Sequence, residues 1–151
     1  MYKNIITKEE LSLLPKENFE GKIDVVTTEE EMFVAINILR NQKMIGFDTE
    51  TKPSFVKGVT GNQVALLQLS TSDHCFLFRL NLLGFPKALV EIIADEKIQK
   101  VGISLKDDFQ ALRKRTNVKP GGFVDLQTIA INYGIEEKSL QKIYAVVFNK
   151  R

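Results

Sequence analysis

The chain has 151 residues, of which 44% are hydrophobic and 26% are charged, a balance typical of one folded domain with a full hydrophobic core. The net charge of +2 permits a polyanionic partner without requiring one, and the single cysteine, Cys75, excludes an internal disulfide framework and a cysteine zinc cluster. The sequence has neither a signal-peptide pattern at its start nor an apolar run of about 20 residues, so we expect a cytoplasmic protein that does not span a membrane.

The first half of the chain predicts two helices and four strands. Residues 1–21 are expected to form a polar lead-in, with one short helix that begins at a Thr7 capping box. Strands are predicted over 23–26, 44–50, 63–70 and 74–78, with a second capped helix between the first two and a loop over 51–61. We expect the strand at 23–26 at a sheet edge, and the nearly continuous apolar run at 63–70 in a central position.

The second half alternates helices and strands within one domain that we expect to cover residues 22–151. Helices are predicted after Pro86, from Leu105 to Leu112, after Asp125 and after Ser139, with strands over 99–103 and 123–124. Three hairpin-linked strands followed by this alternation predict an α/β fold of the ribonuclease H-like kind. Its mixed sheet would combine an antiparallel three-strand meander with parallel strands, flanked by helices.

The strand over 44–50 ends in two carboxylates, Asp48 and Glu50. Residues two apart in a strand point to the same face, so these side chains would lie side by side. Adjacent carboxylates repel each other unless a cation lies between them, and Mg²⁺ or Mn²⁺ selects such oxygen ligands. The alternative interpretation is a strand that runs into a solvated acidic turn.

A third carboxylate comes from the helix that begins at Leu105, where Asp107 and Asp108 compete for the role. At about 100° per residue, Asp108 lies at the flank of the apolar stripe, whereas Asp107 lies nearly opposite it. Asp108 can therefore reach the sheet, and Asp107 should point to solvent. Both could also be first-turn acids that the helix dipole favours.

The segments FDTE, QVALLQLS and VGISLKDD, followed by an apolar helix, occur in this order and resemble the DEDD superfamily of 3′→5′ exonucleases. Within it, the chain looks most like ribonuclease D and the Werner-syndrome exonuclease branch. The resemblance runs from about Ile45 to Phe148. It implies a two-metal hydrolysis of DNA or RNA from a single-stranded 3′ end, with Mg²⁺ or Mn²⁺ as the cofactor.

The resemblance also implies roles for individual residues. Asp48 corresponds to the carboxylate shared by both metal ions, Glu50 to the one on the nucleophile side, and Asp108 to the aspartate of the second motif. Asp107 is the runner-up for that last position. The residues expected to contact nucleic acid are Thr49, Lys52, Phe55 and Ser104.

The family's last motif, Tyr-x-x-x-Asp or His-x-x-x-x-Asp, is absent from this sequence. Tyr144 is followed four residues later by Phe148, no acidic residue follows Glu137, and Tyr144 belongs to the apolar stripe of its helix. We favour a chain truncated before its final helix. It would be weak or inactive by itself, with an exposed apolar groove beside the 44–50 strand that a dimer could cover. The alternative is a catalytically dead module that binds nucleic acid or a protein partner.

Overall fold

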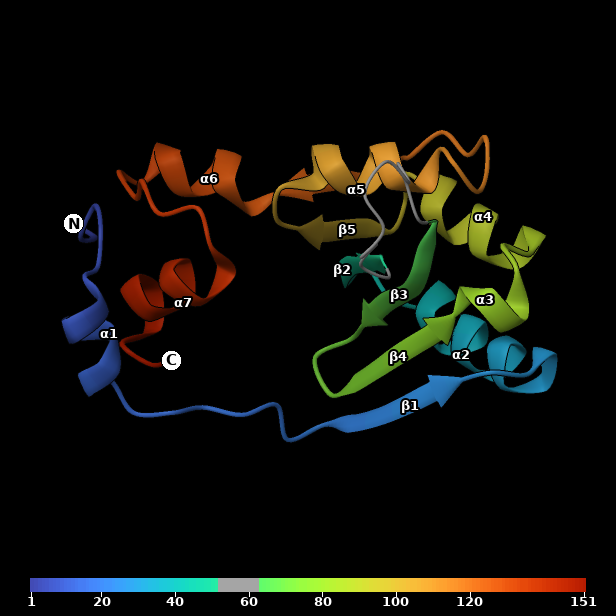
Figure 1. The fold of residues 1–151 in the computed structure, drawn as a ribbon, viewed down its shortest axis with the longest axis horizontal. Helices are drawn as coiled ribbons and strands as arrows, with labels where there is room; N and C mark the ends of the chain where they lie inside the picture. The colour runs from blue at the N-terminus through green and yellow to red at the C-terminus, as the bar shows by residue number, and fades with distance from the viewer. Residues whose placement is uncertain (52–62) are drawn as a thin grey trace, which may run out of the picture.

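The computed structural model describes residues 1–51 and 63–151 (Figure 1). In chain order, the elements are α1 (Lys8–Leu13), β1 (Lys22–Val26), α2 (Glu29–Arg40), β2 (Met44–Thr51), β3 (Val64–Ser70), β4 (His74–Arg79), α3 (Leu80–Leu83), α4 (Lys87–Ala94), β5 (Gln99–Gly102), α5 (Leu105–Leu112), β6 (Phe123–Asp125), α6 (Leu126–Asn132) and α7 (Leu140–Phe148). None of the described helices is long and apolar enough to cross a bilayer.

The strands form one mixed sheet in the order β1-β4-β3-β2-β5-β6. The pairs β2–β3 and β3–β4 are antiparallel, whereas β1–β4, β2–β5 and β5–β6 are parallel. The predicted meander, the edge position of β1 and the inner position of β3 are confirmed. Asp48 and Glu50 therefore lie on a strand, β2, that has a neighbouring strand on each side, β3 and β5.

One face of the sheet carries the hydrophobic core. Residues that share this face through the strand register include Phe47, Leu69 and Phe76, which all lie in one buried cluster. Helices α2, α4 and α5 contribute apolar side chains to the same cluster: Met32, Ala35, Ile36, Leu39, Leu89, Ile92, Ile93, Leu105 and Leu112. These three helices therefore cover the sheet on this side, and the shared core holds α5 next to β2.

The opposite face leaves apolar side chains in solvent. Ile23, Val25 and Met44 are exposed by 56%, 52% and 58%, and the carboxylates of Asp48 and Glu50 lie on this side of β2. Met44 belongs to β2, whereas Ile23 and Val25 belong to β1 at the far edge of the sheet, so the apolar groove expected beside β2 stays a prediction. A dimer that covers it stays a prediction.

The helix starts follow the sequence signals. Thr7 and Thr28 form the two predicted capping boxes, with Glu10 and Glu31 respectively. The short helix α3 was not predicted from the sequence. It is four residues long, and long-range contacts hold it: Leu80 is buried, and Arg115 donates a hydrogen bond of 3.3 Å to the Leu80 carbonyl oxygen.

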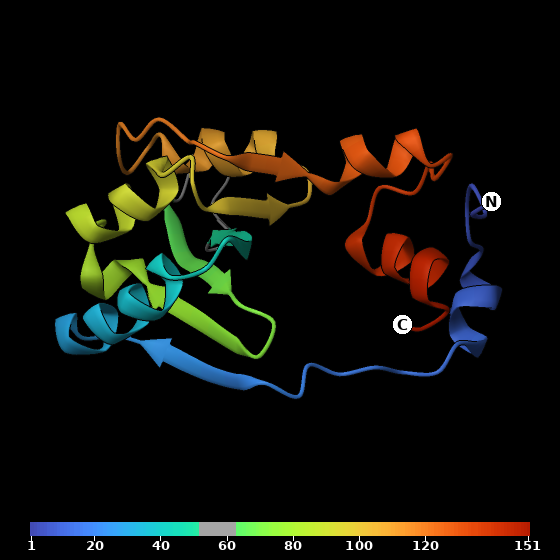
Figure 2. The same cartoon turned by 180° about the vertical axis from the view of Figure 1, so that it is seen from behind.

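Helices α1, α6 and α7 gather at one end of the molecule, away from β1–β4, and both termini lie there (Figures 1 and 2). A small second cluster of buried residues, Ala130, Ile135 and Ile143, lies under α6 and α7. The N-terminal lead-in joins this end through backbone hydrogen bonds, from Glu136 to Asn4 and from Arg151 to Pro15. It therefore packs against the C-terminal helices before the chain enters the sheet.

Lys100 is an unexpected member of the core. It lies in β5 with no exposed surface, and its Nζ donates a hydrogen bond to the Asp95 carbonyl oxygen and lies 5.3 Å from the centroid of the Phe123 ring. Burial lowers the pKa of Lys100 to about 8, although the charges of Asp95 and Glu96 oppose this shift.

We expect this buried lysine to make the protein more stable as the pH rises. Between about pH 8 and the ordinary lysine pKa of 10.5, the unfolded chain binds a proton at Lys100 that the folded chain has released, so the free energy of unfolding increases with pH. The full shift corresponds to about 3 kcal/mol. Urea unfolding of the wild type and Lys100→Met on either side of this pH window measures it. The stability difference between the two proteins should change by about 2–3 kcal/mol, and parallel pH profiles would contradict the prediction.

Candidate functional site

The acidic pair lies at the end of β2. Asp48 is opposite Gln68 and Glu50 opposite Leu66 in β3, and the register shifts between Glu50 and Thr51. Both carboxylate residues are exposed, whereas Thr49 between them is half-buried. The predicted placement of the two carboxylates on one face of the strand is confirmed.

Asp108 reaches β2 from the first turn of α5. Its Oδ1 accepts a hydrogen bond from the Thr49 hydroxyl, whereas Asp107 is exposed. The helical-wheel prediction that Asp108 faces the sheet and Asp107 faces solvent is therefore confirmed. Whether Asp108 binds metal stays a prediction.

The pKa of Asp108 is raised above its ordinary value. Burial is the main cause, and the negative charge of Asp48 raises this pKa further, while the hydrogen bond from Thr49 opposes both. Repulsion between neighbouring carboxylates acts in this direction, but loss of water around Asp108 contributes more than the charge of Asp48.

The turn between β5 and α5 is held by Asp125, at the end of the neighbouring strand β6. The Asp125 carboxylate accepts hydrogen bonds from the backbone N–H groups of Ser104 at 3.3 Å, Leu105 at 3.0 Å and Gln127 at 2.9 Å. The predicted cap of α6 is thus confirmed. No local pattern in the sequence indicates that the same carboxylate also holds the start of α5, because this contact joins residues 20 apart in the chain.

Ser104 adopts a left-handed conformation with φ of 54°. Its hydroxyl oxygen accepts a hydrogen bond of 2.8 Å from the Gln127 side chain. The structure thus gives Ser104 a place in the strand-to-helix turn four residues before Asp108. Its expected contact with nucleic acid stays a prediction, as does that of Thr49.

Two of the expected nucleic-acid contacts, Lys52 and Phe55, lie outside the described residues, as does most of the predicted loop over 51–61. Tyr144 was expected in the apolar stripe of its helix, but it is only half-buried and lies outside the buried cluster of Ala130, Ile135 and Ile143. Its ring lies 4.7 Å from that of Phe148, and its hydroxyl donates to the Glu17 carboxylate.

The donor set suits a hard divalent cation in its chemistry, since Asp48, Glu50 and Asp108 all offer carboxylate oxygens. Asp48 and Asp108 are close enough for the charge of one to raise the pKa of the other. Among residues 1–51 and 63–151, however, no three acidic, histidine or cysteine side chains converge closely enough to hold one ion. The residues therefore suit a divalent cation in the type of ligand that they offer and in the closeness of Asp48 to Asp108.

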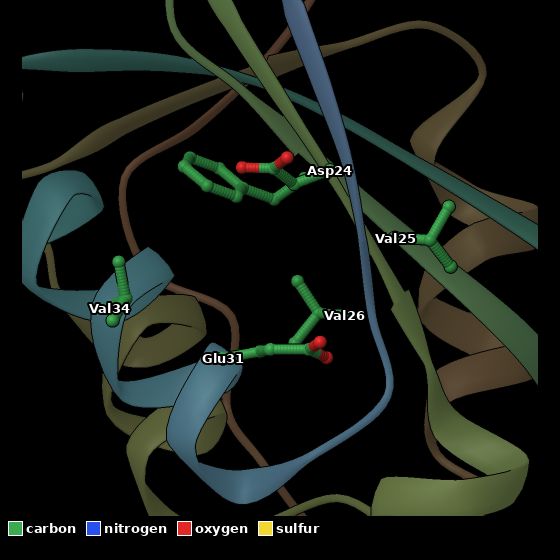
Figure 3. Close-up of a pocket in the computed structure, with 6 residues that line it drawn as sticks. Asp24, Val25, Val26, Glu31 and Val34 are labelled. Carbon is green, nitrogen blue, oxygen red and sulfur yellow. The ribbon is translucent and has the colours of Figure 1, made fainter.

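A separate pocket of about 220 Å³ lies between β1 and α2 and includes the carboxylates of Asp24 and Glu31 (Figure 3). Each carboxylate already has its partners. Asp24 pairs with Lys22 at 2.9 Å and His74 at 2.8 Å, and Glu31 accepts hydrogen bonds in the turn before α2. Asp24 and Glu31 therefore have structural roles, in ion pairs and in the turn before α2.

Known proteins resemble this chain over most of its length. The 3′-5′ exonuclease family matches residues 23–149. The mouse bifunctional 3′-5′ exonuclease/ATP-dependent helicase WRN is 31% identical over 94 residues, which cover 61% of this chain and 7% of WRN. A 3′-5′ exonuclease of Arabidopsis thaliana is 33% identical over 87 residues, which cover 57% of this chain and 30% of the plant protein. The chain thus spans less than a third of either relative.

Solved structures agree with the sequence comparisons. RNase D of Trypanosoma brucei, solved in complex with RNA U12, has a TM-score of 0.65 and 26% identity, covering 72% of this chain and 39% of that one. The EXD2 exonuclease domain, soaked in Mg and GMP, has a TM-score of 0.64 and 29% identity, covering 74% of this chain and 60% of that one. The predicted ribonuclease H-like fold is confirmed. The family match includes β2 and α5 with their acidic residues, and the chain belongs to the 3′-5′ exonuclease family.

Proposed function

We propose that this chain is the nuclease part of a metal-dependent exonuclease that hydrolyses single-stranded DNA or RNA from the 3′ end. The observation that carries the proposal is the family match over residues 23–149, which contains the acidic end of β2 and Asp108 beside it. The RNA complex of the similar RNase D, and the Mg and GMP soak of EXD2, support nucleic acid and a divalent ion as partners.

In this proposal, Asp48, Glu50 and Asp108 hold Mg²⁺ or Mn²⁺. When bound, two such ions would supply Lewis acids at the scissile phosphate and a water of lowered pKa. The chain itself holds the carboxylates in place, with two on β2 and the third on α5, whose start is fixed by Asp125. Thr49, Lys52, Phe55 and Ser104 are the proposed contacts to the nucleic acid.

We propose further that these 151 residues alone bind metal weakly and turn over slowly. The family resemblance assigns three carboxylates to the site. The fourth acid of the family belongs to its last motif, and in these 151 residues no acidic residue follows Glu137. A tyrosine or histidine motif with a fourth acid would complete the ligand set and orient the attacking water.

The test is an assay with 5′-labelled single-stranded DNA and RNA oligonucleotides in Mg²⁺, Mn²⁺ or EDTA. We expect a slow ladder of products shortened from the 3′ end, present only with metal. A phosphorothioate at the 3′-terminal linkage should delay it. The double variant Asp48→Asn/Glu50→Gln should lose the ladder, because two proposed ligands are neutralised. Asp107→Asn is the matched control, because Asp107 is exposed on the same turn as Asp108.

Two outcomes would contradict the proposal in different ways. Oligonucleotide binding without hydrolysis in either metal would favour the catalytically dead binding module. Turnover as fast as that of full-length RNase D, assayed alongside, would contradict the incomplete site.

A further inference from the structure

Thr49 stands between the two carboxylates of β2 but points to the other side of the strand. Asp48 and Glu50 lie on the open face of the sheet, whereas Thr49 is half-buried on the face that carries Phe47. This is the face against which α5 packs, since the rings of Phe47 and Phe109 lie 6.5 Å apart. The Thr49 hydroxyl therefore meets α5 rather than solvent.

The hydroxyl has one clear partner there, the Asp108 carboxylate. It donates to Oδ1 of Asp108, and the backbone N–H of the same threonine donates to Oδ1 of Asp48 at 2.9 Å. One residue thus offers a donor to each of the two aspartates that come together at the end of β2.

Asp108 needs such a donor. It is half-buried, the negative charge of Asp48 is close by, and no ion pair joins Asp108 to a basic side chain in residues 1–51 and 63–151. A carboxylate in this position turns away from its neighbour unless a hydrogen bond holds it. Thr49 supplies that bond.

We propose that Thr49 is a positioning residue, whose hydroxyl fixes the Asp108 carboxylate in the orientation from which it binds the divalent ion. This inference rests on the proposed function, because it takes Asp108 as a metal ligand. A hydrogen bond that orients a ligand limits the rotation that metal binding must otherwise freeze. The role belongs to the hydroxyl and not to the shape of the side chain, so serine can fill it and valine cannot.

The test is the affinity for Mn²⁺ alone, measured by calorimetry and by water-proton relaxation on the metal-free chain. Four variants are compared with the wild type: Thr49→Val, Thr49→Ser, Asp108→Asn and Asp107→Asn. We expect Thr49→Val to weaken Mn²⁺ binding by about tenfold, in line with other residues that orient a metal ligand. Thr49→Ser should stay within about twofold of the wild type, and Asp107→Asn should bind as the wild type does.

Thermal unfolding without metal separates positioning from folding. Thr49→Val keeps the size and branching of threonine, so its metal-free melting temperature should stay close to that of Thr49→Ser. Unchanged Mn²⁺ affinity in Thr49→Val, together with a loss in Asp108→Asn, overturns the role of Thr49 and leaves the proposed function standing. Unchanged affinity in Asp108→Asn, or no Mn²⁺ binding by the wild type, overturns the proposed ligand set and this inference with it.

Discussion

Asp125→Ala is expected to lower the free energy of unfolding by about 3 kcal/mol, because one carboxylate holds the first turns of two helices. It accepts three backbone N–H groups, those of Ser104, Leu105 and Gln127. Alanine leaves all three without this acceptor. A single lost helix cap costs about 1 kcal/mol, and hydrogen bonds to a charged group cost more than neutral ones.

Urea unfolding measures this loss, and Asp125→Asn is the matched control. Asparagine keeps one carbonyl oxygen as an acceptor but has no charge, so we expect about half the loss that alanine produces. Asp107→Asn, on the exposed side of α5, should change stability by less than about 0.5 kcal/mol. A similarly small effect of Asp125→Ala would show that water replaces the carboxylate at both helix starts.

The sequence predicted those parts of the fold that depend on neighbours in the chain. The capping boxes at Thr7 and Thr28 are local patterns, and the structure has both. The side of α5 that carries Asp108 was predictable for the same reason, since the apolar stripe of a short helix fixes which residues flank it. By contrast, α3 depends on the Arg115 side chain, which comes from 35 residues away.

In the candidate site too, the features that depend on neighbours in the chain were predictable, and those that depend on distant residues were not. The pairing of Asp48 with Glu50 follows from strand alternation and was predictable. The contact between Thr49 and Asp108 was not, because the two residues are 59 apart and meet only when α5 packs over the sheet. Lys100 shows the limit of reading residue types alone, since nothing in the local sequence distinguishes a buried lysine from an exposed one.

Phe47→Ala is expected to have the largest effect on stability, a loss of about 3–5 kcal/mol in the free energy of unfolding. Phe47 is only 5% exposed, and its ring meets Phe123 edge-on at 4.8 Å and lies 6.5 Å from Phe109. The rings of Phe109 and Phe123 also meet edge-on at 4.8 Å. The three aromatic residues join β2, α5 and β6, and alanine would leave a cavity between them.

Because Phe47 directly precedes Asp48, this loss of packing should also reach the site. Without the ring, α5 loses its nearest aromatic contact with β2, and the hydrogen bond from Thr49 to Asp108 depends on that packing. Urea unfolding gives the stability, and Mn²⁺ titration under conditions where the variant stays folded gives the effect on the site. Phe47→Leu is the control, since it keeps most of the buried volume and should cost less than about 1.5 kcal/mol. If Phe47→Ala loses stability but binds Mn²⁺ as Phe47→Leu does, α5 is held over β2 by contacts other than this ring, such as the buried Leu105 and Leu112 and the hydrogen bonds of Asp125.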